Sequence, residues 1–113
     1  MKIQTKHQSA FTLIKFSGAI DYKNFKLMKE QLVSMLKDGK TKLIVDLGDT
    51  DFLDGSGLGA FISLSKEAKK MGGAIKLVEV GDQNLKLLGR ACLSRLLDLY
   101  KTEEDAILSL EMN

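Results

Sequence analysis

The fold of this chain is decided by the stretch KLIVDLGDTDFLDGSGLGAFISLSKEAKK, residues 42–70. It opens with a short run of branched apolar residues at 42–47, which predicts a strand that is covered on both faces. Residues 56–71 carry apolar side chains at three- and four-residue spacing, which predicts a helix with one buried face. Ser56, which lies between two glycines where the strand gives way to this helix, is expected to be the helix N-cap. The predicted buried face consists of Leu58, Phe61, Ile62, Ser65 and Ala68.

Alternating strand and helix signals continue along the rest of the chain. A hairpin is predicted from residues 2–8 and 10–17, and further strands from residues 74–80 and 95–100. Further helices are predicted over residues 22–38, over residues 82–90 and from Thr102 onward. The order ββαβαβαβα predicts an α/β fold in which a mixed sheet of about five strands forms a single domain over residues 1–113.

The helix over 22–38 has clear signals at both ends. Asp21 is a plausible N-cap, and Gly39 is a natural C-terminal stop. Its predicted core positions are Phe25, Met28, Leu32, Met35 and Leu36.

Composition restricts the classes of partner. The chain has 113 residues and a net charge of +2, and its lysines are scattered among acids. Nucleic acids and anionic membranes both favour a concentrated basic surface, so neither is expected as a partner. No apolar run approaches the ~20 residues of a membrane span, and the first residues lack a signal-peptide core. We therefore expect a cytoplasmic protein without membrane insertion.

Catalytic and metal-binding patterns are not evident. His7 is the single histidine, which excludes a histidine-dependent triad, and it lies on a predicted edge strand. Cys92 is the single cysteine and is most simply a small buried hydrophobic residue. The acids Asp49, Asp51 and Asp54 do not follow the twelve-residue calcium-loop pattern. We expect no catalytic residue, no metal site and no cofactor.

One pattern points to a nucleotide. Residues 55–60 satisfy the G-x-G-x-x-G/A fingerprint of dinucleotide-binding folds, and Glu79 follows close to where a ribose-binding acid belongs. Against this, residues 48–54 separate the predicted strand from the first glycine, whereas the fingerprint needs a tight turn. Too little chain remains after Val80 for a second nucleotide-binding half, so a small nucleotide-binding protein is the less favoured interpretation.

The chain resembles the STAS domain of anti-sigma factor antagonists. The resemblance rests on the element order, on Gly18-Ala19-Ile20-Asp21 before the first helix, and on the stretch from Asp46-Leu47 to Asp54-Gly55-Ser56-Gly57-Leu58-Gly59. It extends to the Gly72-Gly73 break and to the segment that contains Leu93. In that family the motif is typically Asp-Ser-Ser-Gly-Leu, and the anti-sigma factor phosphorylates the second serine. Ser56 matches that serine, whereas Gly55 departs from the more usual Ser or Thr.

The resemblance implies a function controlled by phosphorylation. The unphosphorylated form would bind an anti-sigma factor with serine kinase activity and free the sigma factor, and phosphorylation of Ser56 would switch binding off. A serine phosphatase would reverse the modification, and the protein would be a monomer or a weak dimer. The resemblance assigns partner binding to six residues, namely Asp21, Asp54, Gly55, Ser56, Gly57 and Leu58. Phosphate adds nearly two negative charges beside Asp54 and, if the family geometry holds, beside Asp21.

Two alternatives stay open at this point. Gly-Ser-Gly between a strand and a helix is a common turn and cap, so Ser56 can be purely structural. The chain can also be a non-signalling STAS subunit of a larger assembly, such as a lipid-transport ATPase, in which the same helix edge binds constitutively. It also stays open whether the interface includes the apolar residues Phe52, Leu53 and Leu58.

Overall fold

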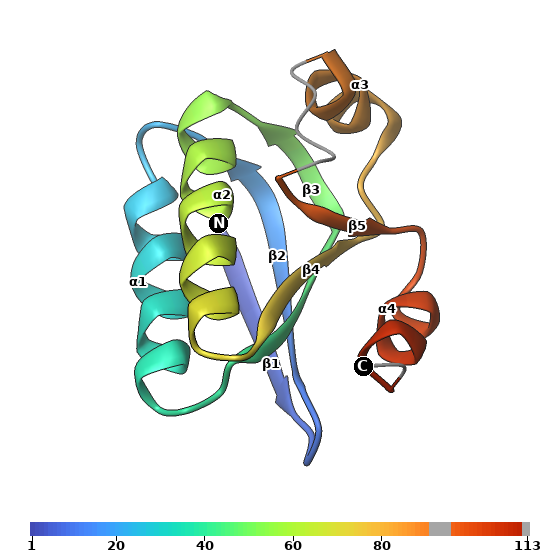
Figure 1. The fold of residues 1–113 in the computed structure, drawn as a ribbon. Coiled ribbons are helices and arrows are strands. Elements are labelled where there is room, and N and C mark those ends of the chain that lie inside the picture. Colours follow the sequence, from blue (N-terminus) through green and yellow to red (C-terminus); the bar gives the residue numbers. More distant parts are fainter. Residues whose placement is uncertain (91–95, 112–113) are drawn as a thin grey trace.

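The protein forms one five-stranded sheet with helices on both faces, as the element order predicts (Figure 1). The structure, a computed structural model, describes residues 1–90 and 96–111. The predictions for Cys92 and Leu93 lie outside the described residues, as does residue 95 of the strand predicted over 95–100. That strand begins only at Asp98, since residues 96 and 97 form a turn and a bend. The elements in chain order are β1 (Lys2–His7), β2 (Thr12–Ile20), α1 (Phe25–Lys37), β3 (Lys42–Leu53), α2 (Gly55–Lys70), β4 (Ala74–Val78), α3 (Asp82–Arg90), β5 (Asp98–Tyr100) and α4 (Glu103–Glu111).

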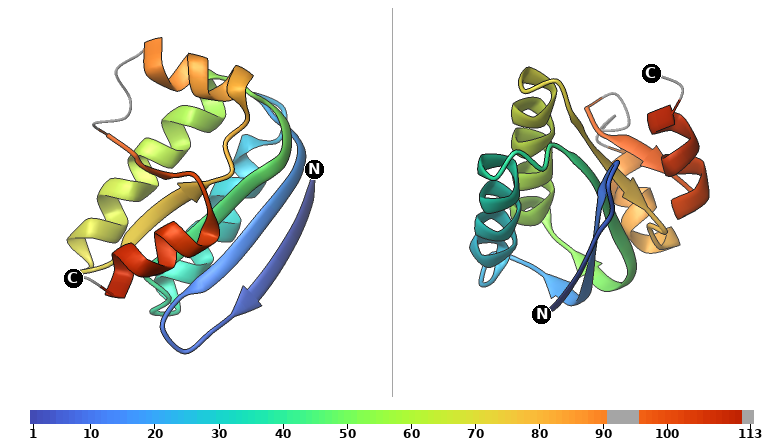
Figure 2. Two further views of the ribbon diagram at one scale, coloured as in Figure 1. Left: turned by 90° about the vertical axis from the view of Figure 1, so that its right-hand side faces the viewer. Right: turned by 90° about the horizontal axis from the view of Figure 1, so that it is seen from below.

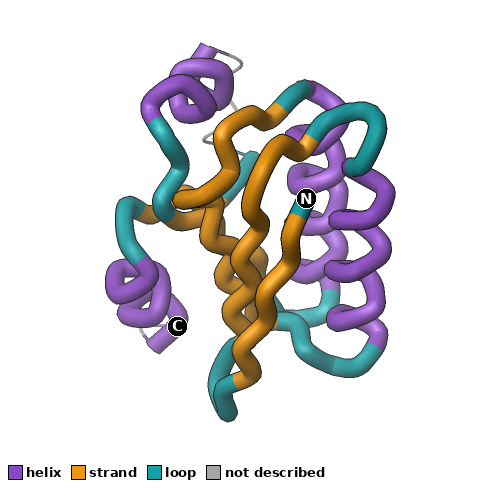
Figure 3. The backbone as a smooth tube through the Cα atoms, turned by 180° about the vertical axis from the view of Figure 1, so that it is seen from behind, coloured by secondary structure: helices purple, strands orange, loops and turns teal. Residues whose placement is uncertain are grey.

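The strands lie in the sheet in the same order as in the chain. β1 pairs with β2 in antiparallel orientation, and each later neighbour pair is parallel. Parallel neighbours require a crossover, and α1 and α2 supply the first two crossovers on one face of the sheet (Figure 2). α4 covers the opposite face. The sheet is therefore the middle of three layers, which the view from behind shows (Figure 3).

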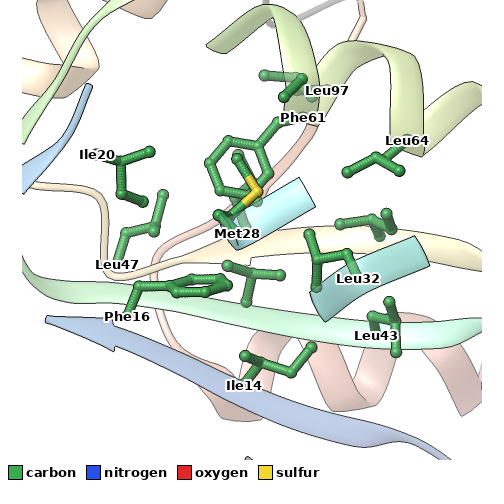
Figure 4. Packing of buried hydrophobic residues seen from close by; sticks show 14 of the residues in the cluster. Ile14, Phe16, Ile20, Met28, Leu32, Leu43, Leu47, Phe61, Leu64 and Leu97 are labelled. Atoms are coloured by element: carbon green, nitrogen blue, oxygen red, sulfur yellow. The ribbon is translucent and has the colours of Figure 1, made fainter. Parts of the chain in front are cut away.

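The main core lies between the sheet and the pair α1 and α2. Phe16 and Phe61 meet there edge to face with ring centroids 6.5 Å apart, and Met28 and Leu32 of α1 pack close by (Figure 4). The predicted apolar faces of both helices are confirmed, except that Phe25 and Ile62 are only partly buried. A smaller cluster of Ile44, Val78 and Ala106 holds α4 on the other face.

β3 is the largest departure from the predicted boundaries. It continues for six residues beyond the predicted end at Leu47 and reaches Leu53. β4 pairs with β3 only up to Asp46, whereas β2 accompanies β3 as far as the pair Ile20 and Leu53. The sequence predicts a loop from Gly48 to Asp51 because three of these four residues are glycine or aspartate, which are poor strand formers. The buried Thr50 hydroxyl, which donates to the Phe16 carbonyl at 2.9 Å, helps to hold it in the sheet.

Smaller corrections concern the other element ends. α1 begins at Phe25 and not at residue 22, and Asn24 takes the cap position that was predicted for Asp21. β4 ends at Val78, two residues earlier than predicted, because Glu79 adopts a left-handed backbone conformation with φ 59°. None of the helices in the described part of the chain has both the length and the apolarity of a membrane span.

Candidate functional site

The carboxyl ends of β2 and β3 bring the predicted site residues together. β3 ends at Leu53, and α2 begins two residues later at Gly55. The single residue between them is Asp54, and its carboxylate is the N-cap of α2. Asp54 Oδ1 accepts the backbone N–H groups of Ser56 at 2.9 Å and Gly57 at 3.2 Å. These bonds satisfy two of the N–H groups that have no partner within the first turn of a helix.

Ser56 is therefore not the N-cap, and that prediction is wrong. It is the second residue of α2, one position after Gly55. Both serine and aspartate are strong cap residues, and the extension of β3 shifts the junction so that Asp54 takes the role. The hydrogen bonds of the turn engage the Ser56 backbone N–H rather than its hydroxyl, and the side chain is half-buried.

The second oxygen of Asp54 reaches across to the loop between β2 and α1. Asp54 Oδ2 accepts the backbone N–H of Tyr22 at 2.8 Å, although the two residues are 32 positions apart in the chain. The Asp54 backbone N–H also donates to the Ile20 carbonyl at 3.1 Å. One carboxylate thus joins the turn that carries Ser56 to the loop that carries Asp21.

Asp21 and Asn24 give this second loop its shape. Asp21 Oδ1 accepts the Lys23 N–H at 2.9 Å, and the Asp21 N–H donates to Asn24 Oδ1 at 2.9 Å. Asn24 Nδ2 donates to the Ala19 carbonyl at 2.8 Å, which closes the loop onto the end of β2. Asp21 is therefore a turn residue one position before Tyr22, and its loop is attached to the Ser56 turn through Asp54.

Gly57 permits the close approach of α2 to the sheet. A Cβ atom on Gly57 would lie 2.7 Å from Ile20 Cγ2 and 2.8 Å from Leu53 Cδ1. Gly55 and Gly59 have no heavy atom within 4 Å of such a Cβ, so they leave the outer side of the turn open. Gly57 is thus a packing requirement, whereas Gly55 and Gly59 keep the surroundings of Ser56 small.

The apolar residues around the turn divide into two groups. Leu53 and Leu58 are buried in the main core, so neither is an exposed apolar residue of the turn. Phe52 is 53% exposed and Tyr22 is 68% exposed. Tyr22 is a site residue that the sequence patterns did not predict, and an aromatic residue directly after Asp21 is the signal that would have found it.

The nucleotide interpretation rested in part on an incorrect boundary. The strand-to-helix turn is tight after all, so a long loop is no argument against the G-x-G-x-x-G/A pattern. The glycine pattern nevertheless has another explanation, because Gly57 fits against Ile20 and Asp54 takes the N–H groups that a diphosphate would need. Glu79 lines a cavity beside the start of α4. Within the described residues, no group of three or more His, Cys, Asp or Glu side chains is placed to hold a metal ion.

Comparison with known proteins identifies the family. The STAS domain profile matches residues 2–106. This chain belongs to the STAS domain family. The STAS match includes every strand of the sheet and the whole candidate site, which confirms the resemblance seen in the sequence.

Relatives of this STAS domain include proteins named as anti-sigma factor antagonists. The anti-sigma-B factor antagonist of Bacillus subtilis is 25% identical over 107 residues, which cover 95% of this chain and 97% of that protein. The anti-sigma F factor antagonist of Paenibacillus polymyxa is 22% identical over 113 residues, which cover 99% and 97%. Among solved structures, an anti-sigma factor antagonist from Mycobacterium paratuberculosis superimposes with a TM-score of 0.87 at 20% identity, over 97% of this chain and 93% of that one.

Proposed function

We propose that this STAS domain is an anti-sigma factor antagonist that binds an anti-sigma factor with serine kinase activity. Binding by the unphosphorylated form releases the sigma factor, and phosphorylation of Ser56 switches binding off. A serine phosphatase restores the active form. The names of the Bacillus subtilis and Paenibacillus polymyxa relatives support the general role. In this proposal the chain is a binding module and a kinase substrate, and it catalyses no reaction itself.

The observation that carries the proposal is the position of Ser56 on α2. The backbone N–H of Ser56 is fixed by Asp54, while its hydroxyl is not needed by the hydrogen bonds of the turn. Gly55 and Gly59 bring no side chain of their own to its neighbourhood, and a Cβ atom at either position would have no heavy atom within 4 Å. A kinase needs this combination, because phosphoryl transfer depends on positioning an accessible hydroxyl.

The same geometry explains how a phosphate would act. The Asp54 carboxylate already accepts two N–H groups at the start of α2, so these donors are not available to a phosphate on Ser56. The phosphate would instead lie beside the negatively charged carboxylate. The phosphate adds about 1.5 to 2 negative charges. A partner surface matched to the neutral serine would meet this concentrated charge, and like charges at an interface cost several kcal/mol. Loss of binding then requires no change of fold.

The proposed partner surface extends beyond the phosphorylated turn. Tyr22 and Phe52 are exposed aromatic residues at the ends of the two segments that Asp54 joins, and aromatic residues are enriched in protein interfaces. We include Tyr22 and Phe52 in the proposed footprint, together with Asp21 and the Ser56 turn. Leu58 is removed from the direct contacts because its side chain is buried.

The deciding experiment is site mapping after phosphorylation. The protein is incubated with ATP and the serine-kinase-like anti-sigma factor of the same genome, and its peptides are analysed by mass spectrometry. We expect one phosphate on Ser56, which is absent from Ser56→Ala and retained in Ser63→Ala. Ser63 is the informative control because it is exposed on the same helix, whereas Thr50 and Ser65 are buried. Phosphate on Ser63 with Ser56 unmodified would contradict the proposal. A stable complex in which Ser56 is never modified would favour the non-signalling subunit.

A further inference from the structure

A buried polar side chain attaches α3 to the sheet. Of the α3 side chains that the structure describes, from residue 82 to residue 86, only Asn84 is buried. Its Nδ2 donates to the backbone carbonyl of Thr50 in β3 at 3.1 Å, although the two residues are 34 positions apart in the chain. α3 thus lies beside the end of β3, on the side away from β2 (Figure 1).

The part of β3 that Asn84 reaches is less firmly paired than the rest of the strand. β4 pairs with β3 only as far as Asp46, so the end of β3 relies on β2 for its strand pairing. That pairing is irregular, because the register shifts between Lys15 and Ser17 and again between Ser17 and Ala19. Such irregularities disrupt the ladder of backbone hydrogen bonds locally. Side-chain contacts therefore have a larger share in holding the end of β3.

Thr50 connects the elements on the two sides of this strand. Its hydroxyl donates to the Phe16 carbonyl of β2 at 2.9 Å, and its own carbonyl accepts the Asn84 amide. Thr50 is only 4% exposed, so water cannot readily replace either partner. A buried carbonyl that loses its donor raises the free energy of the folded state. Two consecutive buried hydrogen bonds therefore join α3, β3 and β2.

These two bonds lie just before the Ser56 turn. Thr50 precedes Asp54 by four positions, and both belong to the segment in which β3 ends and α2 begins. The Asp54 carboxylate accepts the N–H groups of Ser56 and Tyr22, which requires a fixed position at the end of β3. A shift of the strand end would move this carboxylate, and the Ser56 hydroxyl would move with the turn.

We propose that Asn84 is a positioning residue for the phosphorylation of Ser56. Asn84 holds Thr50, Thr50 holds the end of β3, and the end of β3 sets the place of the turn that carries Ser56. The inference rests on the proposed role of Ser56 as the phosphate acceptor. Phosphoryl transfer depends steeply on the alignment of the accepting hydroxyl, so a loosened turn slows the transfer step. Recognition of the protein by the kinase is unaffected, because Asn84 is buried.

Three variants separate the contact from its surroundings. Asn84→Asp keeps the size of the side chain but replaces the donating amide with a carboxylate, which only accepts hydrogen bonds. Gln83→Glu is the matched control, because it makes the same chemical change at the exposed neighbouring position of α3. Thr50→Val breaks the other bond, to Phe16, and introduces no charge. It tests the same connection if the buried carboxylate of Asn84→Asp prevents folding.

Native-state hydrogen exchange on the full chain tests the turn without a kinase. The reporters are the backbone amides that bond to Asp54, namely those of Ser56, Gly57 and Tyr22. We expect these amides to exchange about tenfold faster in Asn84→Asp and Thr50→Val, as for the loss of one buried hydrogen bond. Gln83→Glu should match the wild type. The amides of α1 are the internal reference and should keep their rates, because the main core stays closed.

Two results of the exchange experiment would overturn the inference. One is wild-type exchange at the three reporter amides in both Asn84→Asp and Thr50→Val. The other is an equal acceleration of the reporters and of the α1 amides, which would mean that the variants only lower global stability.

The kinase assay distinguishes positioning from contact. Initial rates of Ser56 phosphorylation are measured at a temperature at which circular dichroism shows every variant to be folded. We expect kcat to fall by about tenfold in Asn84→Asp with KM unchanged, while Gln83→Glu keeps both wild-type values. A raised KM with wild-type kcat would overturn the inference, since α3 would then be a surface that the kinase contacts. If Ser56 of the wild type is not phosphorylated, the proposed function fails, and hydrogen exchange still decides whether Asn84 fixes the turn.

Discussion

Asp54 Oδ2 accepts the backbone N–H of Tyr22 at 2.8 Å while Oδ1 of the same carboxylate caps α2. The two loops of the candidate site are thus held together by one side chain. Any kinase or partner that recognises Ser56 would meet both loops as one fixed surface. Asp54 is therefore a positioning residue for the whole site, in addition to the negative charge that it supplies.

Removal of the Asp54 carboxylate should destabilise the protein. Asp54→Ala leaves the N–H groups of Ser56, Gly57 and Tyr22 without their acceptor, so we expect the free energy of unfolding to fall by about 1–2 kcal/mol. Asp54→Asn can supply only one carbonyl oxygen and should fall between this variant and the wild type. Urea unfolding measures the difference. Asp51→Ala, which removes an exposed acid three positions earlier, should stay within about 0.5 kcal/mol of the wild type.

A methyl group added to Gly57 and one added to Gly59 should change the stability of the protein in opposite directions. Gly57→Ala forces Cβ against Ile20 and Leu53, which are themselves buried, and should cost about 1–3 kcal/mol. Gly59→Ala adds a methyl group in open space within a helix, so it should stabilise the protein by up to about 1 kcal/mol. Thermal melts of the two variants separate these outcomes. Equal melting temperatures would show that α2 does not pack against β2 as closely as described.

The element order and the buried faces were predictable because they depend on local periodicity. The spacing of Met28, Leu32 and Met35 in α1, for example, requires no knowledge of the rest of the chain. The STAS resemblance likewise followed from residues that are close together in the sequence, such as those from Asp54 to Gly59.

The details of the site were not predictable for the opposite reason. Whether Asp54 or Ser56 caps α2 depends on where β3 ends, and β3 is extended through pairing with β2 and the contact of Thr50 with Phe16. The bond from Asp54 to Tyr22 spans 32 positions. Such long-range contacts leave no periodic signal in the sequence.

Ser56→Asp should separate the switch from the fold. An acid at the second position of α2 is favoured by the helix dipole but lies beside Asp54, so the two effects oppose each other and stability should change little. Affinity for the anti-sigma factor should fall, by calorimetric titration, whereas Ser56→Ala should bind like the wild type. Since Ser56 is not the cap, Ser56→Ala should also unfold within about 0.5 kcal/mol of the wild type. Aspartate carries about half the charge of phosphate, so the loss of affinity should be smaller than that caused by phosphorylation. Equal affinities for the Asp variant and the wild type would contradict the electrostatic switch.

Tyr22 provides a test of the proposed partner footprint that leaves the Ser56 turn intact. Its backbone N–H bonds to Asp54 whatever the side chain is, and the ring is 68% exposed, so Tyr22→Ala should fold normally. We expect affinity for the anti-sigma factor to fall by roughly tenfold, as for an aromatic contact worth more than 1 kcal/mol. Met71→Ala is the control, because Met71 is also exposed but follows the far end of α2. Loss of affinity in both variants, or in neither, would place the interface elsewhere.

Asp21→Asn tests whether the Asp21 charge belongs to the site. The asparagine oxygen can still accept the Lys23 N–H, and the backbone N–H can still donate to Asn24, so the melting temperature should change little. We expect slower phosphorylation of Ser56 or altered affinity for the anti-sigma factor, because the loop lies one residue from the Asp54 contact at Tyr22. Asn24→Ala provides the structural comparison, since it removes two hydrogen bonds of the same loop and leaves the charge in place. The contrary outcome is that Asp21→Asn keeps wild-type kinetics and binding, while Asn24→Ala alone lowers the melting temperature. In that case Asp21 only shapes the turn, and Asp54 is the one acid of the site that acts on Ser56.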